Sequence, residues 1–505
     1  GEPGTRRGIH PLLFFLGKGR AAPGDKRKSL RYNTKKEEKC AVRCTEKQEM
    51  TELTGQNADL GSGSVGKWLA KLAIPSIIAQ LINALYNIVD RMYLGRLPGH
   101  LALTGLGLCL PIISILMGFA NLCGMGGAPL CSICRGRGEE EEAEQVMGNS
   151  FTLLLLVGAV LTVVILLFKK PILYLFGASP DTFPYADAYL TIYALGTLFV
   201  MVGLGMNPFI NAQGFGEMGM CTVALGAVVN IVLDPIFIFA LNLGVGGAAL
   251  ATVLSQCCSA VWVLRFLTGR RALLRLKASC LRLKASRVRR ILGLGMSGFA
   301  MAMTNSLVQI LCNASLQLYG GDLYVGIMTI INSVREVISM PVQGITNGCQ
   351  PVLGYNYGAE EYDRVRQGIR FTAVVTMLYS LAVWAMTLAI PGSLIRIFND
   401  ETDLIAAGIP AFRIYFAAFF CMSFQFIGQS TFVGLGKSRF AVFFSLLRKA
   451  FIVAPLTLLL PVLGMGVDGV FWAEPISNVV GGLACLLTMY CTVYRPLGRL
   501  EASKP

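Results

Sequence analysis

The sequence predicts an all-α integral membrane protein in which twelve transmembrane helices form two pseudo-symmetric bundles of six. Three observations lead to this prediction. The 505 residues are 54% hydrophobic and only 14% charged, whereas soluble domains carry about 25% charged residues. Apolar stretches recur along almost the whole chain after residue 67, and each approaches the roughly 20 residues that cross a bilayer as a helix. The two halves of the chain also resemble each other in sequence.

Twelve apolar spans follow one another, separated by short connections that contain turn-forming residues. We place them at residues 68–94, 102–133, 146–168, 186–210, 218–241, 246–267, 287–318, 323–347, 366–390, 408–433, 438–461 and 468–493. An even number of spans puts both termini on the same side of the membrane.

The basic connections decide which side that is. Nine Lys and Arg residues lie between residues 270 and 290, and the other connections on this side are basic as well. The opposite side offers little more than Arg96, Lys169, Lys170 and Arg396. Because cytoplasmic loops are enriched in Lys and Arg, both termini are expected to be cytoplasmic. This topology also accounts for the net charge of +15, so no nucleic-acid partner is expected.

The spans divide the chain into five regions. Residues 1–61 are expected to be a disordered, basic cytoplasmic extension, and a mis-called start codon upstream of Met50 is an alternative explanation for them. The N-lobe, with helices 1–6, covers residues 62–267, and a basic cytoplasmic linker covers 268–286. The C-lobe, with helices 7–12, covers 287–493, and a cytoplasmic tail covers 494–505.

An internal repeat with an offset of about 220 residues relates the two halves. APLCSICRGRGEEE (Ala128–Glu141) parallels QPVLGYNYGAEEYD (Gln350–Asp363), and GVGGAALA (Gly244–Ala251) parallels GVDGVFWA (Gly466–Ala473). Six spans per copy give both copies the same orientation, related by a pseudo-two-fold axis along the membrane normal. Transporters with such parallel repeats bind substrate near the bilayer midplane between the halves.

Carboxylates inside predicted spans are costly, and each is a functional hypothesis by default. Three were selected from the sequence: Asp90, Asp234 and Glu336. Asn230 precedes Asp234 by one helical turn, so both side chains project from one face. Thr252 enters the membrane on the next helix. The expected depths of Asp90, Asp234 and Thr252 are within roughly 10 Å of the outer helix ends, which predicts one oxygen-rich pocket.

Such a pocket suits a proton or Na⁺, because burial disfavours a charged carboxylate and a small cation restores neutrality. The alternative is that Asp90 simply pairs with the adjacent Arg91, although neighbouring helical residues diverge by about 100°. In the second half, Asp90 aligns with Cys312 and Asp234 with Ala454. The cation site is therefore expected once, in the N-terminal half.

Glu336 has no acidic counterpart in the first half, where it aligns with Ser114. It is expected to lie deeper in the membrane, where Arg448 or Lys449 could neutralise it. A structural ion pair and an anchor for cationic substrates are equally good explanations.

Motifs for other chemistry are missing. LGKSR (Leu435–Arg439) is not a Walker A motif, because Thr431 occupies the position of its first Gly. The pair Cys131 and Cys134 lacks the second pair of ligands that a zinc site needs, and no G-x-S-x-G nucleophile elbow occurs. We therefore expect neither an enzyme nor a cofactor.

The same residues resemble the multidrug and toxic compound extrusion (MATE) transporters, in particular their bacterial DinF-like or MepA-like branch. The resemblance covers about residues 62–495 and rests on LAIPSIIAQLINALYNIVDRMYLG, VVNIVLDPIFIF, GVGGAALAT, MPVQGITNGCQPVLGYNYGA and LGKS. It implies two six-helix lobes around a V-shaped cavity in the bacterial cytoplasmic membrane. It also implies export of organic cations or other amphiphiles in exchange for H⁺ or Na⁺, by a protein that we expect to be a monomer.

The resemblance also implies roles for individual residues. The cation-binding and coupling positions match Asp90, Asn230, Asp234 and Thr252, with Asn207 as a weaker match, and Na⁺ suits the first four of these. Candidate residues of the substrate cavity are Glu336, Gln343 and Gln429. Family members with a second cation site carry acids on the seventh and tenth helices, and this sequence has none there.

Two other functions compete with export. A flippase for a lipid-linked precursor shares the broader superfamily fold, but it usually needs a strongly cationic cavity for phosphate headgroups. A membrane-embedded enzyme or receptor is disfavoured by the duplicated six-helix unit. The sequence leaves open the natural substrate and the choice between H⁺ and Na⁺.

Overall fold

The computed structural model describes residues 60–95, 101–176, 178–398 and 401–503, and these residues form helices and short connections with no strand among them. The helices of the first half are α2 (Val65–Gly95), α3 (Leu101–Gly136), α4 (Glu140–Leu175), α5 (Phe183–Leu195), α6 (Thr197–Ala212), α7 (Gly216–Pro235) and α8 (Gly244–Thr268). Those of the second half are α9 (Ala285–Gly358), α10 (Tyr362–Ala389), α11 (Pro391–Arg396), α12 (Thr402–Phe416), α13 (Met422–Gly434), α14 (Ser438–Leu446), α15 (Ala454–Leu460), α16 (Gly466–Met489) and α17 (Arg495–Ala502).

Two helical stretches are too long for single membrane spans. The 74 residues of α9 would extend roughly 110 Å at 1.5 Å per residue, and Ser438–Ala502 is a further stretch of 65 residues. Each contains a glycine with positive φ, Gly321 (φ 69°) and Gly464 (φ 97°), a conformation that glycine adopts at little steric cost. Each stretch is thus two spans, and the described residues hold the predicted all-α membrane fold.

One predicted span is bent. Residues 186–210 were expected to form a single helix, but α5 and α6 meet at an angle of 57° on either side of Gly196. A Cβ atom on Gly196 would lie 2.3 Å from the side chain of Val253 on α8. The bend therefore occurs where the chain passes very close to a neighbouring helix, a contact that sequence periodicity does not reveal.

The two halves meet along α2, α3 and α9 through close backbone contacts. A Cβ atom on Gly136 would lie 1.9 Å from the carbonyl oxygen of Tyr355, and one on Gly358 would lie 2.1 Å from that of Ile133. Gly136 and Gly358 are equivalent positions of the repeat, so this contact has the pseudo-two-fold symmetry that the sequence predicts.

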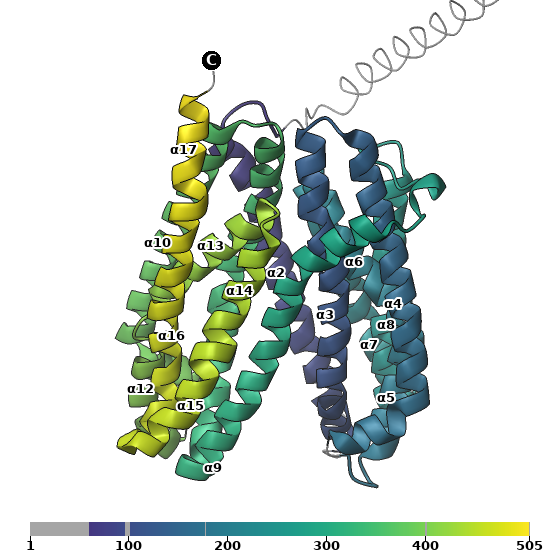
Figure 1. Ribbon diagram of the computed structural model, residues 1–505. Helices are drawn as coiled ribbons and strands as arrows, with labels where there is room; N and C mark the ends of the chain where they lie inside the picture. The colour runs from purple at the N-terminus through teal and green to yellow at the C-terminus, as the bar shows by residue number, and fades with distance from the viewer. Residues whose placement is uncertain (1–59, 96–100, 177, 399–400, 504–505) are drawn as a thin grey trace, which may run out of the picture. The chain divides into compact units, whose positions relative to one another are not determined.

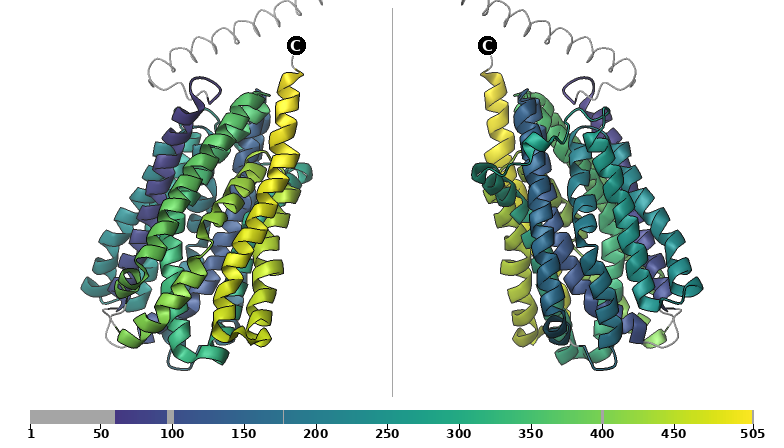
Figure 2. Two further views of the ribbon diagram at one scale, coloured as in Figure 1. Left: turned by 90° about the vertical axis from the view of Figure 1, so that its left-hand side faces the viewer. Right: turned by 90° about the vertical axis from the view of Figure 1, so that its right-hand side faces the viewer.

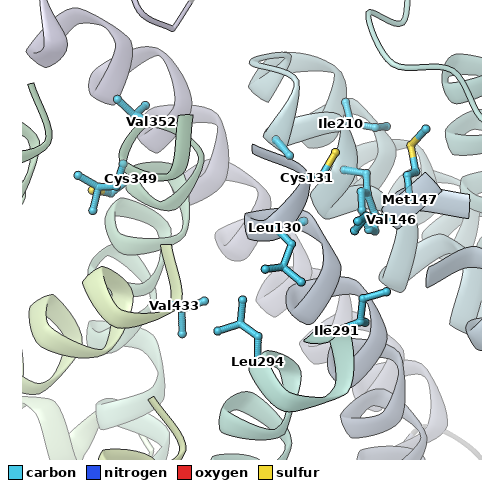
Figure 3. Close-up of a cluster of buried hydrophobic side chains, with 14 of the residues drawn as sticks. Leu130, Cys131, Val146, Met147, Ile210, Ile291, Leu294, Cys349, Val352 and Val433 are labelled. Carbon is cyan, nitrogen blue, oxygen red and sulfur yellow. The ribbon is translucent and has the colours of Figure 1, made fainter. Parts of the chain in front are cut away.

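The apolar core is shared at one end of the helices and divided at the other. One buried cluster draws residues from both halves, including Leu130, Met147, Leu294, Cys349 and Val433 (Figure 3). A second cluster contains residues of the C-terminal half alone, and a third contains residues of the N-terminal half alone. The ribbons accordingly lie close together near the C-terminal end of α17 and diverge toward the opposite end (Figure 1).

Both ends of the described chain lie at the shared end of the bundles. Arg364 at the start of α10 donates to the backbone oxygen of Gly63 at 2.8 Å. Nearby, the Arg366 guanidinium stacks over the ring of Tyr494, 4.8 Å from its centroid. The chain continues as a helix through α17 to Ala502, beyond the predicted end of the last span at residue 493, and α17 extends along the side of the bundle (Figure 2).

The basic connection between the halves is held against α4. Asn149 is fully buried; its Oδ1 accepts from the Lys284 N–H at 2.8 Å, and its Nδ2 donates to the Arg282 oxygen at 3.1 Å. Glu142 forms a bidentate ion pair with Arg287 at 2.6 and 3.0 Å. These contacts tie the first helix of the second half to the first half.

Replacing Asn149 by leucine is expected to lower the free energy of unfolding by about 1–3 kcal/mol, because buried backbone groups of the connection lose their hydrogen-bond partners. The change is measured as a lower melting temperature of the purified protein in detergent. Glu141→Ala, at an exposed position of the same helix, serves as the control. Equal melting temperatures for the two variants would show that the connection does not depend on Asn149.

Candidate functional site

Three polar side chains predicted from the sequence lie together between α7 and α8. Asn230 Nδ2 is 3.3 Å from Asp234 Oδ1 and 3.4 Å from Thr252 Oγ1. Asn230 and Asp234 are fully buried, and Thr252 is 7% exposed. The Oδ1 atom of Asn230 is buried and accepts no hydrogen bond within the described part of the chain. The cluster thus combines carboxylate, amide and hydroxyl oxygens within reach of one small cation.

Asp90 of α2 completes this cluster. Its carboxyl group lies near that of Asp234, so the two groups repel each other when both are ionised. Binding of one proton removes this repulsion. The pair is therefore able to hold a proton between two helices. The side chain of Arg91, the alternative partner for Asp90, lies outside the described residues.

A break in regular α-helix positions Asp234. The α-helical part of α7 ends at Pro235, which has no N–H to donate to the preceding turn. The chain continues as a π-helical turn at Ile236–Ala240, and π-helical turns of this kind often occur at functional sites. Because Asn230 is four residues earlier, both polar groups stay on the same face, which packs against α8.

Next to the cluster lies a cavity with a volume of about 240 Å³. This is close to the lower end of the roughly 300–1,000 Å³ typical of pockets for drug-sized ligands. No charged side chain occurs among the described residues that line it. Its polar lining consists of Ser76, Gln80, Asn83, Tyr86, Asn121, Ser132, Asn207, Asn211, Thr222, Ser255, Gln256, Ser259, Asn347 and Gln350.

The cavity ends one helical turn from the cluster. Tyr86 lines the cavity and precedes Asp90 by four residues on α2. Ser255 also lines it, and its hydroxyl donates to the Thr252 backbone oxygen at 2.8 Å. A molecule in the cavity would therefore be bound by helices that also carry the cation cluster.

Asn207, predicted to belong to the cation site, occupies a different place. Its side chain lines the cavity and donates to the backbone oxygen of Gly219 at 3.3 Å, and no contact to Asp234 or Thr252 is among its hydrogen bonds in the described region. Asn207 lies on α6 and contacts α7 at Gly219, at an earlier turn of α7 than the one that carries Asn230. The weaker match in sequence thus corresponds to a position in the cavity wall.

The three residues predicted for the substrate cavity lie elsewhere on the second half. Gln429 lies inside the C-terminal bundle. Its amide nitrogen, Nε2, donates to the Ala441 oxygen at 3.0 Å and to Ser445 Oγ at 2.8 Å. Gln343 is half-buried on α9 and Glu336 is exposed. These two share the face of α9 that carries Gln350 of the cavity wall, because the three are spaced by seven residues.

The expectation that Arg448 or Lys449 neutralises Glu336 is wrong. Both cations instead contact Glu474 of α16, Arg448 at 3.2 Å and Lys449 at 2.9 Å. Glu474 is not among the residues predicted from the sequence, although the repeat contains a signal that points to it. GVDGVFWA ends one residue before Glu474, just as GVGGAALA ends one residue before Thr252.

Among the described residues, no group of three or more His, Cys, Asp or Glu side chains could hold a metal ion. A cation bound beside Asp234 would thus be held by the mixed oxygens of the cluster, the ligand type that hard cations such as Na⁺ take.

Comparison with known proteins identifies the family. Two stretches of the chain, residues 75–236 and 297–459, match the family model described as MatE. The chain belongs to the MATE family. The two matches fall in equivalent positions of the two halves, so the family unit is the repeat itself. The resemblance to MATE transporters drawn from the sequence is therefore confirmed.

Similar proteins are export proteins rather than enzymes. "Multidrug export protein MepA" of Staphylococcus haemolyticus (strain JCSC1435) is 24% identical over 444 residues, which cover 87% of this chain and 96% of that protein. MepA of Staphylococcus aureus (strain MSSA476) is 24% identical over 431 residues, which cover 84% and 94%. This MATE protein is thus similar to MepA over nearly the whole length of the staphylococcal proteins.

Solved structures confirm the fold. A structure described as the outward-facing conformation of a multidrug resistance MATE family transporter of the MOP superfamily has a TM-score of 0.82 at 21% identity, and the match covers 89% of this chain and 99% of that one. A structure of MATE in the bent conformation has the same TM-score at 22% identity, covering 88% and 99%.

Proposed function

We propose that this MATE protein is a secondary active multidrug exporter, which moves organic cations or other amphiphilic compounds out of the cell in exchange for H⁺ or Na⁺. The observation that carries this proposal is an uncharged polar cavity that ends one helical turn from two interacting carboxyl groups, the half-buried Asp90 and the buried Asp234. The names of the staphylococcal relatives support multidrug compounds as substrates.

The wall of the cavity suits amphiphiles. Amide and hydroxyl groups can accept or donate hydrogen bonds in several orientations, and Met125, Met220 and Leu204 add adaptable apolar surface. A cationic group in the cavity would gain from the negative charge of the nearby carboxyl pair, and that charge is cancelled when the pair takes up a proton or Na⁺. Substrate and coupling ion would therefore compete through charge, as exchange requires.

Coupling to movement would follow from the position of the pair between helices. Asp90 and Asp234 lie on α2 and α7, and α2 also packs against α9 of the other half, where Gly348 approaches the backbone of Ala73. Protonation or Na⁺ binding changes the force between α2 and α7, and the contact with α9 passes this change to the second half. In this proposal the halves alternate between closure at the shared end and closure at the opposite end.

The cavity lining speaks against the flippase alternative. A lipid-linked phosphate needs cationic side chains, and none lines the cavity within the described part of the chain. The proposal further places the protein as a monomer in a bacterial cytoplasmic membrane with both termini cytoplasmic, in keeping with the basic connections at residues 270–290.

The test is transport in sealed vesicles that contain the purified protein. An outwardly directed proton gradient and an equal sodium gradient are imposed separately, and the movement of ethidium is followed by its fluorescence. We expect one gradient to drive ethidium transport against its concentration, with protein-free vesicles as the control. Ethidium movement that is equal with and without both gradients would contradict the proposal.

A further inference from the structure

The C-terminal half contains a buried cluster of ionisable side chains in which the cations outnumber the acids. Glu474 receives hydrogen bonds from Lys449 Nζ at 2.9 and 3.1 Å and from Arg448 Nη1 at 3.2 Å. Arg448 also donates to Asn478 Oδ1 at 2.5 Å. These three ionisable side chains are at most 9% exposed, and Arg335 of α9 faces the same group. Three cations thus surround one buried carboxylate.

Arg335 has no carboxylate within ion-pair distance among the described residues. Its side chain makes no hydrogen bond or ion pair within the described residues, and its Nε atom is buried without a partner. The neighbouring Glu336 is exposed and forms no ion pair with Arg335. A guanidinium in this position is costly unless something accepts hydrogen bonds from it.

A small cavity lies where an acceptor is missing. Its volume is about 20 Å³, and Arg335, Asn332, Tyr415 and Lys449 line it. The Nδ2 atom of Asn332 is a second buried donor without a partner. Since about 10–15 Å³ accommodates one water-sized sphere, the cavity has room for one small species and not for an organic molecule. The Glu474 carboxylate and Asn305 also line the cavity, and the Oδ1 atom of Asn305 is a buried acceptor without a partner. The two cations of the lining, Arg335 and Lys449, still outnumber its one carboxylate, so the charge of the lining favours an anion.

The repeat gives this cavity a counterpart in the first half. Glu474 is equivalent to Thr252, and Cys312, which also lines the cavity, is equivalent to Asp90. Lys449 lies in a π-helical turn, Leu447–Val453, just as Asp234 lies beside one. Positions near the two acids of the first half therefore correspond, in the second half, to positions near a cluster of cations.

We propose that this cavity binds a small inorganic anion of the size and charge of chloride, held by Arg335, Asn332 and Lys449. The bound anion satisfies the two donors that lack partners and offsets the excess positive charge, so it stabilises the C-terminal bundle. The proposal is independent of the exported substrate and of the coupling ion, which concern the first half.

The experiment measures thermal unfolding of the full-length protein in detergent while chloride replaces gluconate at constant sodium and ionic strength. We expect the melting temperature to rise by about 2–8 °C with a saturable dependence on chloride. Bromide should act like chloride. The larger acetate should have no effect, and stabilisation by acetate alone would overturn the assignment to a halide-sized anion.

Variants locate the effect. Arg335→Gln should weaken the apparent chloride affinity more than tenfold, and Asn332→Ala provides the same test if the first variant does not fold. Arg413→Gln, at an exposed position of α12, should retain the full chloride response. A melting temperature that ignores chloride in the unchanged protein, or a response equally strong in both cavity variants, would overturn the proposal.

Discussion

Replacing Asp234 by asparagine is expected to reduce gradient-driven ethidium export to the level of vesicles without protein. Asparagine keeps the size of the side chain and can still contact Asn230, but it can neither release a proton nor neutralise Na⁺. The interaction with Asp90 then no longer changes with the bound ion, so the coupling to movement of α2 and α7 is lost. Transport is measured in vesicles under imposed proton and sodium gradients.

A control variant and two further measurements separate coupling from folding. Asp322→Asn, at an exposed position between the two spans of α9, makes the same chemical change away from the cluster and should transport normally. The Asp234 variant should be produced in similar amounts and still bind ethidium, because the cavity lining is intact. Export by Asp234→Asn at the unchanged rate would rule out this residue as the coupling group.

The sequence predicted the fold well because membrane spans are local. Length and hydropathy placed twelve spans, and the break at Gly321 falls within the short predicted gap between residues 318 and 323. The bend at Gly196 was not predicted. It occurs where the chain passes close to α8, and contacts between helices are not encoded in the periodicity of either helix.

The candidate site was predicted in part, for a similar reason. Spacing of four residues placed Asn230 and Asp234 on one face, and matching depth correctly brought Thr252 and Asp90 to them. Asn207, which only the resemblance to the family suggested, lies on the wall of the cavity. Their roles in binding a cation stay predictions.

The error at Glu336 has another origin. The sequence offered Arg448 or Lys449 as a cation that could neutralise Glu336, and it did not single out Glu474, the acid that both contact. Depth in the membrane does not determine which face of a helix meets which neighbour. Alignment of the two repeats one residue further would have set Glu474 opposite Thr252, and a buried acid beside two cations would have followed.

Replacing Gly295 by alanine is expected to abolish transport through a different step, the closure of the shared end. Here α3 crosses the first part of α9, and a Cβ atom on Gly295 would lie only 1.8 Å from the carbonyl oxygen of Leu122. A backbone oxygen cannot yield as a flexible side chain can, so the helices must separate. Ethidium export should fall at least tenfold, and the buried thiol of Cys349 in the shared core should react faster with maleimide.

A matched control lies one turn away on the same helix. A Cβ atom on Gly298 would meet no atom within 4 Å, so Gly298→Ala adds the same methyl group without a clash and gains up to about 1 kcal/mol of helix propensity. It should transport normally and protect Cys349 as the unchanged protein does. If both alanine variants behaved alike, the crossing of α3 and α9 would not be a contact that transport requires. The comparison thus tests closure of this end independently of the carboxyl pair, because neither glycine touches α7 or α8.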